Sequence, residues 1–274
     1  VGDRMNALAK DPRFKFPDND AGRAEIHAYI QTWLGKIRAQ LPRAFRTLVK
    51  GNVEVKRLPL AEEPGAPAAY GGAGSIDGSV PGKFWINLRT TELHSKYSLP
   101  DLTMHEAIPG HVWQGEYANQ MPLIRTMLAF NAYSEGWALY AETLGNEMGF
   151  YEDPWARYGT LQDEQLRAMR LVVDTGIHSK GWTREQAIDF MLENSGMTRT
   201  EGVAEVERYI AIPTQALAYK VGALKIQELR EKAEEQLGEN FDIREFHAEV
   251  LDTGSLPMPV LEAKIDRWIA SKAS

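Results

Sequence analysis

The segment from residue 105 to residue 111 reads HEAIPGH, and it places two histidines and a glutamate close together. Imidazole nitrogens bind divalent metal ions, and a carboxylate beside them can take a proton from a water molecule. In the zinc-binding pattern HExxH, the two histidines are four residues apart and lie on one face of a helix. His105 and His111 are instead six residues apart, which is about 600° on an ideal helix, so a straight helix would separate them.

Pro109 and Gly110 lie between the two histidines and provide the break that this spacing needs. A proline inside a helix clashes with the carbonyl group four residues earlier, which here belongs to His105. Glycine then allows backbone conformations that are closed to other residues. We therefore expect the helix to break at Pro109-Gly110, so that His111 returns to the side of His105.

A catalytic zinc site of this kind needs a third protein ligand and an open position for water. Glu135 is the candidate, 24 residues after His111, which leaves room for a helix, a turn and an antiparallel return. Glu142 follows two helical turns later on the same face, where it can accept the free N–H of a ligand histidine. These residues predict one zinc ion held by His105, His111 and Glu135, with Glu106 as the general base.

Helices must carry most of these residues, because helical periodicity and capping signals extend along most of the chain. Apolar residues recur every three or four positions from Ile26 to Leu41, after a cap at Asp18 or Asn19. Further helices are expected from 154 toward 178, over 183–195, 203–210 and 214–237, then after Asp242 and from Pro259 onward. The fold class is therefore predicted as mainly α.

The segment between residues 50 and 100 has a different pattern. Val53 and Val55 alternate with polar residues, the stretch YGGAGSIDG at 70–78 is rich in turn residues, and KFWINL at 83–88 resembles a strand. We expect two to four short strands, as a small sheet or hairpin before the metal-binding helix. No linker-like composition divides the chain, so we expect residues 1–274 to form a single domain.

Composition excludes several classes of function. The net charge is −7 and no basic block is present, which argues against nucleic acid as the main partner. The chain has no cysteine, so disulfides, thiolate metal sites and cysteine nucleophiles are excluded. No apolar run reaches the roughly 18 residues of a membrane span.

Five motifs together resemble the bacterial domain of unknown function 885 (DUF885) family. The segment HEAIPGHVWQ at 105–114 resembles the family signature HEAxPGHxxQ. The other four segments follow in the family's order along the chain, at 84–87, 134–142, 174–183 and 208–222. The resemblance covers nearly the whole chain. It implies that this chain is the C-terminal, catalytic half of a longer family architecture.

The family is similar to the mostly helical zinc peptidases that use a glutamate ligand, so the resemblance implies a zinc peptidase fold and a peptide substrate. Members often carry export or lipoprotein signals, which implies a periplasmic or exported location. The N-terminal half of the full-length protein would pack on this chain. In that group, an edge strand before the metal helix pairs with the substrate backbone. Phe84–Leu88 lies in the corresponding place, so Trp85 and Asn87 are candidate substrate contacts.

Other candidate residues lie toward the C-terminus. Enzymes of this architecture place a tyrosine after the metal helices, which makes Tyr219 a candidate donor to a developing oxyanion. His178 is a second candidate for that role or for a substrate contact, or it caps its own helix. Asp174 can orient His178 or form a helix pair with it. Arg208 and Lys220 can receive a substrate carboxylate, or they can belong to a solvated helix face.

The sequence also allows two other functions. A carboxylate-rich dimetal enzyme could use Glu106, Glu135 and Glu142 with the two histidines, although paired Glu-x-x-His motifs are missing. A non-catalytic domain could keep the metal site and bind peptides without cutting them. A zinc-dependent peptidase that hydrolyses peptide bonds is the function that the motifs favour.

Overall fold

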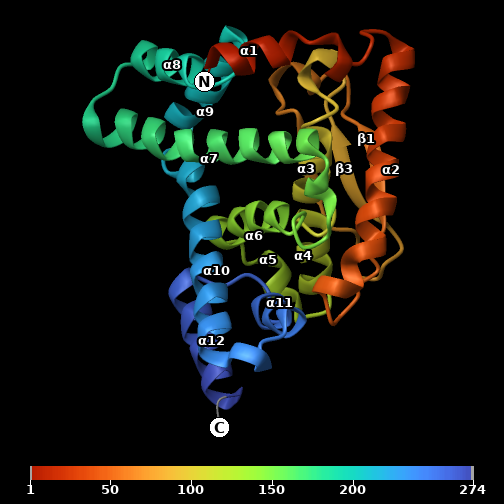
Figure 1. The fold of residues 1–274 in the computed structure, drawn as a ribbon, viewed down its shortest axis with the longest axis vertical. Helices are drawn as coiled ribbons and strands as arrows, with labels where there is room; N and C mark the ends of the chain where they lie inside the picture. Colours follow the sequence, from red (N-terminus) through yellow and green to blue (C-terminus); the bar gives the residue numbers. More distant parts are fainter. Residues whose placement is uncertain (1, 273–274) are drawn as a thin grey trace.

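The computed structural model describes residues 2–272, and it is mainly helical with one small sheet, as the sequence predicts (Figure 1). The helices and strands follow the chain in this order: α1 (Gly2–Lys10), α2 (Asp20–Ala44), β1 (Val53–Arg57), β2 (Ala69–Gly72), β3 (Gly82–Ile86), α3 (Leu99–Glu106), α4 (His111–Ala118), α5 (Leu123–Met127), α6 (Asn131–Thr143), α7 (Pro154–Lys180), α8 (Arg184–Glu193), α9 (Arg199–Ala211), α10 (Gln215–Leu237), α11 (Ile243–Leu251) and α12 (Met258–Lys272). Between residues 2 and 272, none of the helices has the length and hydropathy that crossing a bilayer requires.

Local residues explain several of the helix ends. The Asp153 side chain accepts the N–H of Trp155 at the start of α7, and Gly181 ends that helix with a left-handed φ of 70°. The predicted capping box of Thr183 is present at the start of α8. α9 begins at Arg199, earlier than predicted, because a second capping box starts at Thr198.

Three strands form one sheet in the order β1-β3-β2. Phe84 of β3 lies opposite Val55 of the parallel neighbour β1 and opposite Gly71 of the antiparallel neighbour β2. β3 is therefore the central strand, and β1 and β2 are the edges. Val55, Phe84 and Ile86 are buried on one face of the sheet and join the main hydrophobic core.

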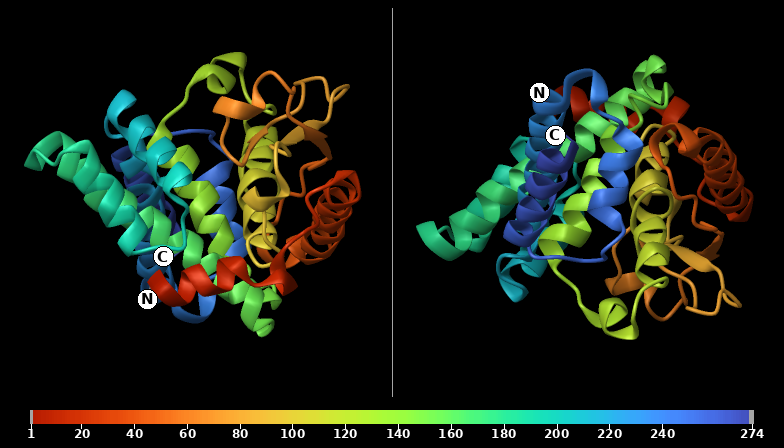
Figure 2. Two further views of the ribbon diagram at one scale, coloured as in Figure 1. Left: turned by 90° about the horizontal axis from the view of Figure 1, so that it is seen from above. Right: turned by 90° about the horizontal axis from the view of Figure 1, so that it is seen from below.

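The elements around the α3–α4 pair form layers. α2 and the sheet lie on one side of this pair, and α6 with α10 lies on the other (Figures 1 and 2). The main core lies between these layers and contains the fully buried side chains of Ile30, Trp113, Trp137 and Phe246. A smaller core around Val173 joins α7, α8, α9 and the start of α10. The main core supports the α3–α4 pair, which carries the HEAIPGH segment at 105–111.

α6 and α10 make a close helix crossing. Gly136 of α6 meets Gly222 of α10, and a Cβ atom on Gly222 would lie 1.8 Å from the carbonyl oxygen of Ala132. No residue other than glycine fits at that point, because even a Cβ atom would overlap with the backbone of α6. Glu135 is next to one of these glycines and Tyr219 is one turn before the other, so the crossing brings both residues to the same region.

Candidate metal centre

The break between α3 and α4 brings the two histidines together. α3 ends at Glu106 and α4 begins at His111, so Pro109 and Gly110 lie in the turn between them, which confirms the predicted break. Gly110 is required there, because a Cβ atom on it would lie 1.8 Å from the carbonyl oxygen of His105. The two imidazole rings consequently meet edge to face, with their centroids 4.9 Å apart.

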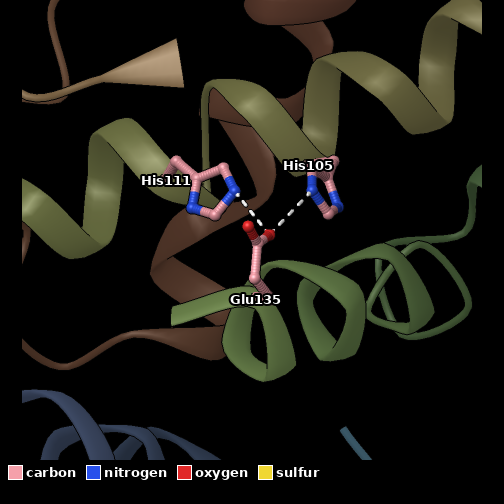
Figure 3. Close-up of side chains that lie close together, drawn as sticks. All are labelled: His105, His111 and Glu135. Carbon is pink, nitrogen blue, oxygen red and sulfur yellow. Dashed lines mark ion pairs between the residues drawn. The ribbon is translucent and has the colours of Figure 1, made fainter. Parts of the chain in front are cut away.

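Glu135 of α6 faces both rings (Figure 3). Its Oε2 atom lies 3.3 Å from Nε2 of His111 and 3.8 Å from Nε2 of His105. One ligand atom from each of the three residues lies within 4.8 Å of the others. The structure thus brings together the three residues that the sequence offers as ligands, and this group could hold a metal ion.

The hydrogen-bonding state of these atoms tests whether a cation fits. Nδ1 of His105 lies 2.6 Å from Oε1 of Glu142 and donates to it, because a carboxylate can only accept. Burial lowers the pKa of His105 well below its usual value, so the ring is neutral and its Nε2 atom is an acceptor. Oε2 of Glu135 is buried and accepts no hydrogen bond of normal geometry. Two buried acceptors therefore face each other, and a cation satisfies both.

The charges of the three residues also favour a cation between them. Burial by itself would raise the pKa of Glu135, but the contact with His111 and the charge of that ring lower it to about 2. Burial lowers the pKa of His111, whereas the hydrogen bond and charge of Glu135 and the charge of Glu106 raise it. The net effect is a pKa above the usual value. A metal ion would replace the proton on His111, since an imidazole binds metal in its neutral form.

Glu106 is buried beside the ligands, with 8% of its surface exposed. Burial is the main cause that raises its pKa to about 7, against the opposing charge of His111. A carboxyl group with such a pKa can accept a proton and release it again near neutral pH. Gly71 of β2 donates a backbone hydrogen bond to this carboxylate, and a Cβ atom on Gly71 would lie 1.9 Å from the Glu106 carbonyl oxygen.

A buried network holds His105 in its orientation. Oε1 of Glu142 accepts hydrogen bonds from Nδ1 of His105 and, at 3.2 Å, from Arg167. Asp101 is also hydrogen-bonded to Glu142, and burial together with the charge of Glu142 raises the pKa of Asp101 far above its usual value, so Asp101 carries the proton. Arg167 and Asp101 were not identified from the sequence. The available signal was the i,i+4 spacing of Arg167 with Asp163, which form an ion pair.

Tyr219 of α10 packs against His105, with the two rings nearly parallel and their centroids 6.2 Å apart. The guanidinium group of Arg170 lies 4.6 Å from the centroid of the same tyrosine ring. Gln215 donates to Oη of Tyr219 at 3.3 Å and to Oε1 of Glu135 at 3.4 Å. The structure therefore places Tyr219 next to the ligand group, with Arg170 and Gln215 as neighbours that the sequence did not reveal.

The group of His105, His111 and Glu135 lies within a segment that a family model recognises. The model of the family described as bacterial protein of unknown function (DUF885) matches residues 1–265. The chain belongs to the DUF885 family. A comparison of this DUF885 chain with curated proteins found no match.

Two solved structures resemble the DUF885 chain. A protein of Colwellia psychrerythraea, described as a "putative lipoprotein", matches with a TM-score of 0.95 and 46% sequence identity, over 99% of this chain and 47% of that one. A "putative lipoprotein of unknown function" of Shewanella oneidensis matches with a TM-score of 0.75 and 23% identity, over 96% of this chain and 48% of that one, which shows a shared fold. The DUF885 chain spans about half the length of each.

Two predicted site residues of the DUF885 chain have partners elsewhere. Nε2 of His178 donates to the carbonyl oxygen of Tyr209 at 3.0 Å, so it binds α9 instead of capping its own helix. Oδ2 of Asp174 accepts the backbone N–H of Thr214 at 3.0 Å, at the start of α10. In the described part of the chain, neither side chain has a hydrogen bond or ion pair with the three ligands or with the other.

The expected pairing of Phe84–Leu88 with a substrate backbone is wrong, because β3 is the central strand and has a neighbour on each side. Asn87 is fully buried, and its amide donates to the carbonyl oxygen of Glu63 at 2.8 Å. Asn87 therefore organises a loop and cannot contact a substrate. Trp85 is partly exposed and packs against Tyr70 of β2, with ring centroids 6.4 Å apart.

The two predicted carboxylate-binding residues differ in their surroundings. Lys220 of α10 forms an ion pair with Glu164 of α7 at 2.6 Å, so its charge is used to join two helices. Arg208 of α9 forms an ion pair with Glu205 and donates to Gln215, which contacts the ligand group. Only Arg208 of these two is linked by hydrogen bonds to the candidate metal centre.

Proposed function

We propose that this domain is a zinc-dependent metallopeptidase, with one zinc ion bound by His105, His111 and Glu135. One observation carries the proposal: Nε2 of His105 is a buried acceptor that faces the carboxylate of Glu135, and Oε2 of that carboxylate accepts no hydrogen bond of normal geometry. Two imidazoles and a carboxylate form the ligand set of many catalytic zinc sites and leave one position open. Glu142 is paired with Arg167 and is not free to bridge a second ion, which argues against the dimetal alternative.

A bound zinc ion would polarise the scissile carbonyl group and acidify a water molecule beside it. Glu106 takes a proton from that water while the water oxygen forms a bond to the carbonyl carbon. The Tyr219 hydroxyl donates a hydrogen bond to the carbonyl oxygen, on which negative charge develops. When the C–N bond breaks, Glu106 gives the proton to the departing amine, so one water molecule is divided between the two products.

The substrate backbone is assigned to β2. This strand is an edge of the sheet, and its residue Gly71 lies directly against Glu106. An extended peptide can add to such an edge through main-chain hydrogen bonds. We therefore assign to Ala69–Gly72 the role that was predicted for Phe84–Leu88.

An exported, lipoprotein-like location is part of this proposal. It is supported by the similarity to the Colwellia psychrerythraea protein, which is described as a "putative lipoprotein". That protein is about twice as long as this chain. We therefore propose that a further segment of the full-length protein packs on this domain.

The test measures metal content and peptide cleavage on the same samples. We expect one zinc per chain by elemental analysis, and cleavage of a quenched fluorescent peptide library. Glu106→Gln should keep the zinc and lose about 100-fold or more of the turnover, because the base that accepts the water proton is gone. Undiminished turnover in this variant would exclude Glu106 as the base. Peptide binding without any cleavage by the zinc-loaded protein would support the non-catalytic alternative.

A further inference from the structure

Arg208 is a fixed and partly exposed cation beside the metal centre. Its Nη1 atom donates to Oε1 of Gln215 at 2.9 Å, and Nε2 of Gln215 donates to Oε1 of Glu135 at 3.4 Å. One side-chain amide therefore separates the guanidinium from a proposed ligand.

The cluster around Arg208 has more positive than negative charge. Oε2 of Glu205 accepts hydrogen bonds from Arg170 and Arg208, both at 2.9 Å, and from the Tyr209 hydroxyl at 2.5 Å. Burial would raise the pKa of Glu205, but the two arginines and the tyrosine lower it to about 2, so it is ionised. Two guanidinium groups thus share one carboxylate. In residues 2–272, Asp174 forms no ion pair with either arginine.

Arg208 is the member of this cluster that an incoming ligand can reach. Its side chain is 30% exposed, whereas the Arg170 side chain is 9% exposed. Glu205 and Gln215 each occupy one terminal nitrogen of Arg208, and the guanidinium has five N–H donors in total. Donors therefore remain for a carboxylate, which guanidinium binds more strongly than it binds neutral acceptors.

We propose that Arg208 binds the free C-terminal carboxylate of a peptide whose scissile bond lies at the metal centre. Two hydrogen bonds and one amide group span the distance from Glu135 to Arg208. An extended peptide covers such a distance with one or two residues, at about 3.3–3.6 Å per residue. The substrate class is therefore short peptides, from which one or two C-terminal residues are released. This inference rests on the proposed metallopeptidase function.

The binding test uses a matched pair of peptide analogues on the zinc-loaded protein. In both, a phosphonate replaces the scissile amide; one ends in a free carboxylate two residues later and the other ends in a carboxamide. By titration calorimetry, we expect the carboxylate form to bind about tenfold to a hundredfold more tightly, because a charge-assisted hydrogen bond is lost in the amide. Arg208→Gln should remove this difference, and Arg208→Lys should restore part of it.

The variants are chosen so that the fold survives. In Arg208→Gln, Glu205 keeps its contacts with Arg170 and Tyr209. The matched control is Arg184→Gln, which removes another arginine that pairs with a glutamate of α9. This control should keep the full preference for the carboxylate form.

A second measurement needs no metal. An N-acetyl dipeptide with a free carboxylate should protect Arg208 of the metal-free protein from phenylglyoxal, and the corresponding amide should not, as read by peptide mass spectrometry. Equal binding of both phosphonates with equal protection would overturn the carboxylate site and leave the peptidase proposal standing. Selective protection by the carboxylate in a protein that takes up no zinc would overturn the peptidase proposal and support the carboxylate site.

Discussion

His247 and His105 are both buried histidines, yet their hydrogen bonds differ in one respect. Nδ1 of His247 donates to the carbonyl oxygen of Ala44 at 2.7 Å, and its Nε2 accepts the hydroxyl of Tyr140 at 2.8 Å. His105 also donates through Nδ1, but its Nε2 faces the unprotonated carboxylate of Glu135. Burial alone does not identify a metal ligand. The partner of the second ring nitrogen distinguishes the two histidines, because a donor there completes a structural histidine, whereas an acceptor there leaves a position that a cation could occupy.

The largest effect should come from making the same substitution at both histidines. His105→Gln should reduce the zinc content from one ion per chain to nearly none, because the amide oxygen is a poor replacement for imidazole. His247→Gln should keep the zinc and lose about 1–3 kcal/mol of unfolding free energy, since one hydrogen bond of the buried ring is lost. Elemental analysis and urea unfolding measure the two effects. Loss of zinc in His247→Gln would show that the two histidines are not functionally distinct.

A smaller effect is expected from the residue that orients His105. Glu142→Gln should weaken zinc binding about 10–100-fold, because the amide is a weaker acceptor for the N–H of a ligand histidine. Competition with a chromophoric chelator measures the affinity. The matched control is Glu63→Gln, which removes a buried carboxylate paired with Arg57 and far along the chain from the ligands. If both variants bind zinc like wild type, Glu142 does not tune the site.

The effect that is smallest near neutral pH, and that grows only in acid, concerns the pH dependence of stability. Burial lowers the pKa of His247 to about 3, from 6.5 when exposed. As the pH falls below 6.5, His247 of the unfolded chain therefore binds a proton, whereas His247 of the folded chain does not. This difference lowers the free energy of unfolding by about 1.4 kcal/mol per pH unit until about pH 3. His247→Gln should lose this part of the slope, as measured by urea midpoints of the metal-free protein. An unchanged slope would mean that His247 is protonated in the folded state.

The helices and the ligand group could be predicted because their signals are local. Asp153 before a proline, the Thr183 capping box and the glycine at 181 fix helix ends through residues close in sequence. The two histidines lie within seven residues, and the proline and glycine between them explain how they meet. Glu135 lies only 24 residues after His111, and the chain reaches it through α4, the short helix α5 and the start of α6.

The remaining features depend on how distant segments pack. β2 has the sequence AYGG, which favours a turn, yet the structure has a strand there. Gly71 of this strand lies so close to the end of α3 that only glycine fits, and this contact joins segments that are distant in the sequence. The strand order β1-β3-β2 places β3 in the centre of the sheet, and this order could not be predicted from the strand sequences. Arg167 and Arg170 lie on the long helix α7, and only the way this helix crosses α3, α6 and α10 brings them to His105 and Tyr219.

The contact of Gly136 with Gly222 has a consequence for sequence variation in this family. The separation of α6 and α10 at the site is set by backbone touching backbone, so it cannot shrink, and it grows if either glycine gains a side chain. Glu135 and Tyr219 therefore keep a constant spacing even when residues elsewhere on the two helices are exchanged. Exposed positions such as Val221 and Leu224 on α10 are free to drift. We expect the two glycines to limit which substitutions can accumulate around the site.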